Sequence, residues 1–313
     1  MNTPSLTVGR YKLRFSAENP FTFQGFSGSA WRGVMGHALK KTVCITKTER
    51  CPDCMLYRSC VYPYIFETPP PPGSARLQKY NAVPHPFVLG LPWGRTDPSR
   101  TFETGLTLFG RGNHYLAYMI HSLQRAASEG VSHSPPLLLE SVLQSGADGE
   151  DVSIWDEEKR LDPRAAISPV VPAVPRAIRI DLLTPLRMRL LDRYVTPEQF
   201  QFSDLFRSLL SRISSLQYFH TEAPLMTDFA GLTRAASEAA FSSKAVSWCD
   251  WTRRSSRQQQ EMQMGGLVGS ATVTGDFALW REFWPYLWLG QWTHVGKATS
   301  MGLGRYSIEI IQP

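Results

Sequence analysis

The chain lacks several features that would place it in whole classes of protein. None of its apolar runs approaches the length of a membrane-spanning helix. The N-terminal stretch MNTPSLTVGRYKLRFSA has no apolar segment of the kind found at the centre of a secretory signal peptide. No segment recurs at the period of about 20 to 50 residues that solenoids and propellers need. These absences predict a cytoplasmic protein without membrane contact and exclude the repeat folds.

Composition and charge are moderate. Hydrophobic residues make up 42% and charged residues 19% of the 313 positions, which is typical of a globular protein. At roughly 150 residues per domain, the length predicts two domains. The formal net charge is +6, but residues 148–164 contain seven acids and three bases, a net of −4, so the rest carries +10. This positive excess favours a polyanionic partner.

Hydrophobic periodicity predicts the same order of elements in both halves of the chain. Each half shows a strand, a helix, further strands, a helix and a last strand. This order predicts an α+β protein with two ferredoxin-like βαββαβ domains in tandem. Residues 144–175, rich in glycine, proline and acids, separate domains 1–150 and 170–313. The expected strands are 7–17, 101–109, 177–183 (stopped by Thr184 and Pro185), 265–274 and 305–311, and the expected helices are 29–43, 113–128, 200–219 and 279–289.

The first expected helix carries a candidate catalytic face. Its apolar stripe consists of Trp31, Val34, Met35, Ala38 and Leu39. The opposite face consists of Gly33, Gly36, His37, Lys40 and Lys41. A histidine exchanges a proton near pH 7, and a lysine stabilises charge on a phosphate. Each glycine destabilises the helix by about 1 kcal/mol relative to alanine, and we expect close approach of another backbone to offset this. The alternative is an ordinary solvated helix face.

Four of the five cysteines lie close together in the sequence. Their spacing is C-x6-C-x2-C-x5-C, at Cys44, Cys51, Cys54 and Cys60. Four thiolates complete a tetrahedral Zn²⁺ site and leave no open catalytic position, so the spacing predicts a structural zinc. An iron–sulfur cluster and a set of small buried apolar residues are the alternatives. Cys249 lies far away in the sequence.

Two segments of the second half are candidates for phosphate binding. The loop from His294 to Tyr306 is rich in glycine, which permits positive φ and close backbone approach, so its amides can cradle a phosphodiester. It contains neither the Walker A pattern nor a dinucleotide-binding fingerprint, and a plain hairpin or bulge loop is the alternative. The stretch WTRRSSRQQQ contains three arginines and no acid, which suits phosphate recognition. The candidate RNA-binding residues are Arg32, Arg253, Arg254, Arg257, Gly296, Lys297, Gly302, Gly304 and Arg305.

These motifs follow one another in an order that resembles a known family. The order is RGVMGHALKKTVC, CPDC, C-x-Y-x-x-x-FE at Cys60 to Glu67, LTLFGRGNHYLAYMI, TPLRMR, RRSSRQ before MGGLVG, and HVGKATSMGLGRY. In this order the chain resembles the CRISPR-associated repeat-processing endoribonucleases of the RAMP superfamily, in their cysteine-containing branch. The terminal glycine-rich loop is a hallmark of that superfamily.

The resemblance implies two RRM-type ferredoxin-like domains, with a cysteine-rich insertion in the first. It implies binding of CRISPR repeat RNA and cleavage at the base of its stem-loop, by attack of a ribose 2′-hydroxyl and without a catalytic metal. It places the general base or acid at His37. From their position on the same helix face, we expect Lys40 or Lys41 to help neutralise the phosphate. Other Cas effector subunits are the further partners that it implies.

Two other functions compete with this interpretation. A non-catalytic RAMP subunit that binds RNA within an effector complex would use the same loop and basic residues, but it needs no proton-transferring histidine. A zinc-ribbon transcription regulator would explain the cysteines, but the sequence offers no helix of the kind that reads DNA.

Overall fold

The chain divides into two compact units. The computed structural model describes residues 3–74, 76–77, 82–155, 158, 160–255, 260–274 and 277–311, with the backbone alone at 253–255, 260–261 and 277–279. The N-terminal unit consists of Leu6–Ser168 with Ser215–Ala223, and the C-terminal unit consists of Met1–Ser5, Pro169–Ser214 and Pro224–Pro313. No helix in the described part of the chain has the length and apolar composition needed to cross a membrane.

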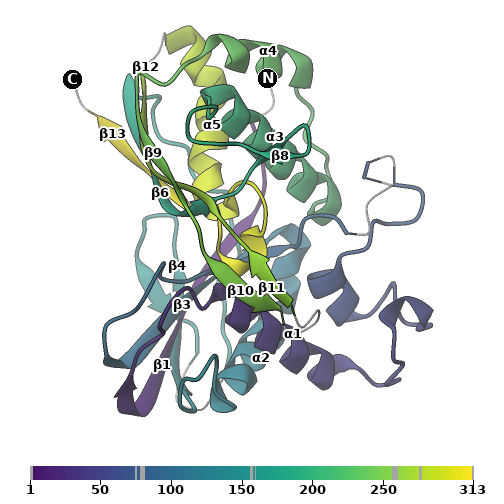
Figure 1. The fold of residues 1–313 in the computed structure, drawn as a ribbon. Helices are drawn as coiled ribbons and strands as arrows, with labels where there is room; N and C mark the ends of the chain where they lie inside the picture. Colours follow the sequence, from purple (N-terminus) through teal and green to yellow (C-terminus); the bar gives the residue numbers. More distant parts are fainter. Residues whose placement is uncertain are drawn as a thin grey trace. The chain divides into compact units, whose positions relative to one another are not determined.

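The N-terminal unit is a ferredoxin-like sheet with one added strand. Its sheet has the order β2-β3-β1-β4-β5, and every pairing is antiparallel. The first four strands in that list reproduce the ferredoxin-like arrangement, in which the first and third strands lie in the centre. The elements are β1 (Val8–Phe21), α1 (Gly28–Val43), β2 (Phe87–Gly90), β3 (Ser99–Phe109), α2 (Leu116–Ser128), β4 (Leu138–Ser145) and β5 (Asp151–Ser153) (Figure 1).

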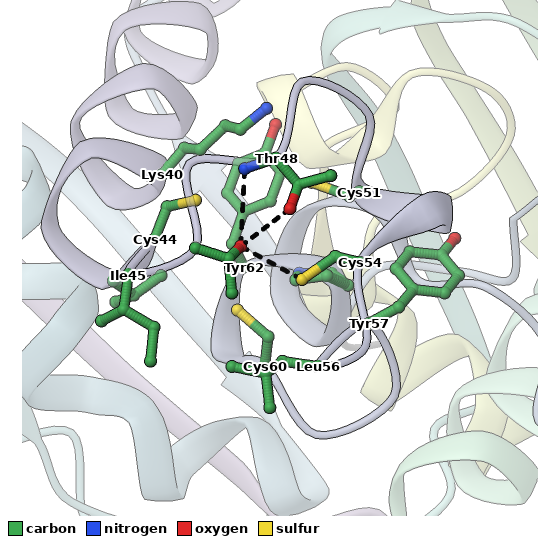
Figure 2. A pocket seen from close by; sticks show the side chains of 13 residues that line it. Lys40, Cys44, Ile45, Thr48, Cys51, Cys54, Leu56, Tyr57, Cys60 and Tyr62 are labelled. Carbon is green, nitrogen blue, oxygen red and sulfur yellow. Dashed lines mark hydrogen bonds between the residues drawn. The ribbon is translucent and has the colours of Figure 1, made fainter.

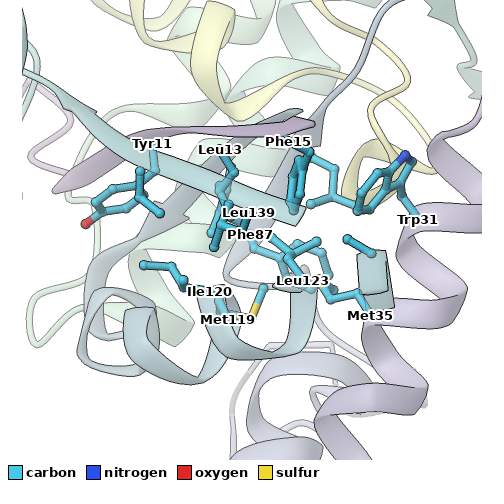
Figure 3. Packing of buried hydrophobic residues seen from close by; sticks show 14 of the residues in the cluster. Tyr11, Leu13, Phe15, Trp31, Met35, Phe87, Met119, Ile120, Leu123 and Leu139 are labelled. Carbon is cyan, nitrogen blue, oxygen red and sulfur yellow. The ribbon is translucent and has the colours of Figure 1, made fainter. Parts of the chain in front are cut away.

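Alternation along β1 decides which face of the sheet carries the helices. Tyr11, Leu13 and Phe15 are buried on one face, because successive side chains of a strand point in opposite directions. Trp31 and Met35 of α1 pack onto this layer, with Met119 and Leu123 of α2 beside them (Figure 3). The hydrophobic stripe predicted for α1 is therefore its buried face.

A long insertion connects α1 to β2. It holds all four clustered cysteines, a short 3₁₀ turn (η1, Cys51–Asp53) and one turn of π-helix (η2, Pro63–Glu67). The predicted cysteine-rich insertion is confirmed in its place within the first domain. The expected helix over 113–128 begins later, at Leu116, because a 3₁₀ segment (η3, Gly110–Tyr115) precedes it.

The C-terminal unit repeats the same topology. Its main sheet has the order β13-β6-β12-β9, so the predicted pair of α+β ferredoxin-like domains is confirmed. The elements are β6 (Ala177–Leu186), β7 (Arg189–Leu190), β8 (Arg193–Tyr194), α3 (Phe202–His220), α4 (Phe229–Glu238), β9 (Ser243–Cys249), β10 (Thr252–Ser255), β11 (Gln260–Gln263), β12 (Gly266–Thr274), α5 (Phe277–Thr293) and β13 (Tyr306–Ile311) (Figure 1). The last turns of α3, from residue 215 onward, are part of the N-terminal unit.

The predicted end of β6 at Leu183 is wrong, since the strand continues through Pro185 to Leu186. The register against β12 shifts between the pairs Leu267–Leu186 and Gly269–Leu182. Pro185 thus lies within an irregularity, where its missing N–H is not needed for the ladder. This irregular segment also provides the groups that hold the glycine-rich loop.

Candidate functional site

The outward face of α1 gathers four polar side chains of the N-terminal unit. His37 and Lys41 are exposed, and Arg32 and Lys40 are half-buried. The described residues offer the His37 ring no hydrogen bond, and its neighbour Gly33 adjoins open space. A ring that is exposed and uncommitted on a rigid helix can reach a bound ligand and exchange a proton with it.

Lys40 and Lys41 differ in their surroundings. The Lys40 ammonium lies over the Tyr62 ring, 5.7 Å from its centroid, and donates to the main-chain oxygen of Glu49 at 3.4 Å. Lys41 instead forms an exposed ion pair with Glu129 at 3.9 Å. An exposed pair of this kind contributes little to stability, but it partly neutralises Lys41. Lys40 is therefore the better candidate for a phosphate.

The two helix glycines have different surroundings, neither of them the close backbone approach that we expected. At Gly36 the neighbour is an aromatic ring, because an added Cβ would lie 2.2 Å from Cζ of Phe66. At Gly33 an added Cβ would meet nothing within 4 Å. Gly36 thus makes room for the insertion, whereas Gly33 leaves the surface beside His37 open.

The four cysteines line one pocket at the end of α1. Cys44, Cys51, Cys54 and Cys60 surround a cavity of about 30 Å³, which Lys40 and Tyr62 also line (Figure 2). All four are free thiols. The hydroxyl of Thr46 lies 3.2 Å from Sγ of Cys54 and lowers the pKa of that thiol.

The cavity is large enough for a single ion or water molecule. Zinc with four thiolate ligands holds each sulfur about 2.3 Å from the metal. Among the described residues, no three potential ligands already lie close enough together for this. The donor set and the shared pocket suit zinc, while the distances require the thiols to draw together. The structural zinc therefore stays a prediction.

The glycine-rich loop of the C-terminal unit is anchored to the irregular end of β6. Lys297 N–H donates to the Arg187 oxygen at 2.8 Å, and Gly304 N–H donates to the Pro185 oxygen at 3.1 Å. The Thr184 hydroxyl donates to the Gly302 oxygen at 2.8 Å and accepts from the Arg305 N–H at 2.9 Å. These bonds leave the exposed side chains of Lys297 and Arg305 on a firmly held backbone.

Two of the predicted glycines are required by space as well as by φ. A Cβ at Gly296, where φ is 84°, would lie 2.2 Å from the Arg187 oxygen, and one at Gly304, where φ is 69°, would lie 1.8 Å from the Val295 oxygen. Gly302 has a φ of 101°, a conformation that side chains other than glycine rarely adopt. The loop geometry thus depends on all three.

His294 opens the loop and is not exposed to ligand. It is 3% exposed, and its Nδ1 lies 3.2 Å from the Leu303 oxygen. Burial lowers the pKa of His294 to about 3, and the positive charges of Arg305 and Arg212 act in the same direction. The imidazole is therefore neutral at every physiological pH, and its contacts assign it to the loop scaffold.

The arginine-rich stretch forms a hairpin. Arg253 and Arg254 lie in β10, paired with Met262 and Glu261 of β11. Arg257 lies outside the described residues. The backbone thus places the two arginines on a β-ribbon of the C-terminal unit. The glycine-rich loop belongs to the same unit, whereas the α1 face belongs to the N-terminal unit.

Tyr62, Phe66 and His85 contact this α1 face, although no role was predicted for them from the sequence. The first two were visible as the aromatic positions of the C-x-Y-x-x-x-FE motif, and their four-residue spacing was the available signal. His85 lies 19 residues after Phe66, without a motif of its own.

The chain is similar to known proteins both in sequence and in structure. A family model described as CRISPR-associated endoribonuclease Cas6 matches residues 180–306, and a model described as an N-terminal domain matches residues 6–166. No curated protein matches the chain by sequence.

Solved structures resemble the chain over nearly its full length. A Cas6 product complex has a TM-score of 0.59 at 15% identity and covers 97% of this chain and 99% of that chain. Cas6 of Thermus thermophilus has a TM-score of 0.55 at 16% identity, with the same coverage. A chain of a partial Cas6-RT-Cas1–Cas2 complex has a TM-score of 0.60 at 13% identity, covering 99% of this chain and 47% of that one. At these identities the likeness concerns the fold.

Alanine at the two glycines of α1 should change stability in opposite directions. Gly33→Ala gains about 1 kcal/mol from helix propensity, which raises Tm by about 2–4 °C. Gly36→Ala should lower Tm, because its methyl group forces the Phe66 ring away from the helix. Thermal unfolding of both variants beside the wild type measures this, and equal increases in Tm would contradict the contact.

The buried neutral His294 should make stability fall in acid. The unfolded chain takes up a proton near pH 6.5, whereas the folded chain does so only near pH 3, so stability is present above pH 6.5 and is lost as the pH falls below it. Between pH 7 and pH 5 this amounts to about 2 kcal/mol. Denaturant unfolding of wild type and His294→Asn at both pH values measures it. An equal pH dependence in both proteins would contradict the assignment.

The cysteine pocket should hold about one zinc per chain, from four-thiolate coordination. Elemental analysis of protein purified under reducing conditions measures it, and Cys51→Ser with Cys54→Ser should remove the metal. Cys249→Ser, at the unclustered cysteine, is the matched control and should keep it. Metal-free wild-type protein would contradict the prediction.

Proposed function

Because this chain belongs to the Cas6 family of CRISPR-associated endoribonucleases, we propose that it cuts CRISPR repeat RNA by transesterification. The ribose 2′-oxygen forms a bond to the neighbouring phosphorus as the bond from phosphorus to the 5′-oxygen breaks. A base accepts the 2′-hydroxyl proton and an acid returns a proton to the 5′-oxygen. The products are a 2′,3′-cyclic phosphate and a 5′-hydroxyl, and the balance of atoms requires neither water nor a metal.

His37 carries this proposal. It is an exposed imidazole on a rigid helix, beside an open glycine and one turn from Lys40. Such a ring supplies proton transfer, and the Lys40 ammonium stabilises the charge that develops on the phosphate. His294, which opens the glycine-rich loop, is buried and is therefore a weaker candidate for proton transfer.

The C-terminal unit would hold the RNA. Lys297 and Arg305 project from a loop whose backbone is bonded to β6, so both cations can meet phosphates without ordering the loop first. Arg253 and Arg254 lie on the β10–β11 ribbon, and Arg257 follows them in the sequence. We infer that these cations contact the phosphates of a repeat stem-loop.

A role as RNA-binding subunit of a larger Cas assembly is compatible with the same surface. After cleavage the protein would keep hold of the repeat-derived end of its product through these cations. A purely non-catalytic role is favoured less, because binding alone gives no reason for an uncommitted histidine between Gly36 and Lys40.

His37→Ala should slow single-turnover cleavage of repeat RNA by about 10² to 10⁴, while affinity stays within about two-fold, because a proton-transfer group acts on the transition state. His121→Ala is the matched control, since His121 is an exposed histidine on α2 of the same unit, and it should keep the wild-type rate. Cleavage by His37→Ala at the wild-type rate would show that another residue carries out proton transfer.

A further inference from the structure

A row of side chains on α1 matches a stack of aromatic rings in the insertion. Arg32, Gly36 and Lys40 are spaced four residues apart and so follow one row along the helix. The rings of Tyr62 and Phe66 stack on each other, with centroids 5.5 Å apart and planes 21° apart. Since Gly36 has no side chain, Phe66 enters the gap between the two cations.

Each cation of the row lies over one ring of the stack. The guanidinium of Arg32 lies 4.2 Å from the Phe66 centroid, and the ammonium of Lys40 lies 5.7 Å from the Tyr62 centroid. Both distances fall within the range of about 6 Å for cation–π attraction. The rings thus restrict where two long, otherwise mobile side chains can go.

A chain of hydrogen bonds that begins at buried Thr68 also holds Arg32. The Thr68 hydroxyl donates its single proton to the Val83 oxygen at 2.9 Å, so in its 2.9 Å contact with His85 it must accept from Nδ1–H. A neutral His85 then presents the Nε2 lone pair, which accepts from Nη2 of Arg32 at 3.0 Å. Thr68 therefore sets the tautomer that lets His85 bind a cation.

We propose that Phe66, Tyr62 and His85 are positioning residues, which hold Arg32 and Lys40 ready for the phosphates that flank the cleaved bond. This role rests on the proposed function. The helix rise separates the Cα atoms of Arg32 and Lys40 by about 12 Å, with His37 between them in the sequence. A cation already held in place loses less side-chain freedom when it binds a phosphate than a mobile one does.

A purely structural role for Phe66 makes a different prediction, because the ring also packs 6.5 Å from buried Phe87. Loss of packing lowers stability whatever the identity of residue 32. Loss of positioning lowers RNA affinity only while Arg32 is present. A double-mutant cycle separates the two.

The cycle uses Phe66→Leu, Arg32→Gln and both together. The measurement is the Kd for repeat RNA with a 2′-deoxy nucleotide at the cleavage position, at several salt concentrations. Each single variant should weaken binding about ten-fold, the effect of a lost charge-assisted contact. Each should also reduce the salt slope by about 0.7 to 0.9 per lost phosphate contact. The double variant should bind no more weakly than Arg32→Gln alone.

Two controls exclude general damage. Phe23→Leu removes a buried ring of the same core and should lower Tm without changing the salt slope. At His85, His85→Gln retains an acceptor for Arg32 and should bind RNA more tightly than His85→Leu, although neither retains the ring.

Additive effects in the double variant would overturn the positioning role, and so would unchanged affinity in Phe66→Leu with its Tm lowered. Wild-type protein that binds repeat RNA no better than an unrelated RNA of equal length would contradict the proposed function itself. The wild-type measurement alone gives that outcome, without any variant, and it would also rule out the positioning role.

Discussion

The contact between the Phe66 ring and Gly36 is the constraint on which the candidate site depends. A methyl group at position 36 would lie 2.2 Å from Cζ of the ring, so glycine at this position lets the ring pack directly on α1. With the ring in place, Arg32 has an aromatic surface beneath it. The same segment brings Tyr62 to Lys40 and closes the cysteine pocket at the helix end. The absence of a side chain at Gly36 thus allows the insertion to contact both the helix and its two cations.

The C-terminal unit reaches a similar result with main-chain groups. Its loop residues adopt positive φ, and the irregular end of β6 satisfies their N–H and C=O groups. Thr184 both donates to and accepts from this loop, and the buried ring of His294 contacts it at the Leu303 oxygen. In both units, cations that suit phosphate binding lie on a backbone that is already fixed. Such a site loses less conformational entropy when it binds its ligand.

The fold could be predicted from sequence because both sheets follow simple periodicity. Alternation in β1 and the stripe from Trp31 to Leu39 each identify one buried face. The continuation of β6 through Pro185 could not be predicted from the sequence, because it depends on a shift in the register between β6 and β12. The helix stripe also identified the polar face with His37. The partners of that face could not be predicted, since Phe66 and His85 come from an insertion without regular periodicity, and their contacts with Arg32 exist only after folding.

We propose that this chain cuts repeat RNA through the ribose 2′-hydroxyl. The most direct measurement is mass spectrometry of the RNA ends after cleavage in excess EDTA. Transesterification leaves a 2′,3′-cyclic phosphate on the upstream fragment and a 5′-hydroxyl on the downstream fragment, and we expect both. A 3′-hydroxyl with a 5′-phosphate, or no cleavage until a divalent metal is added, would contradict it.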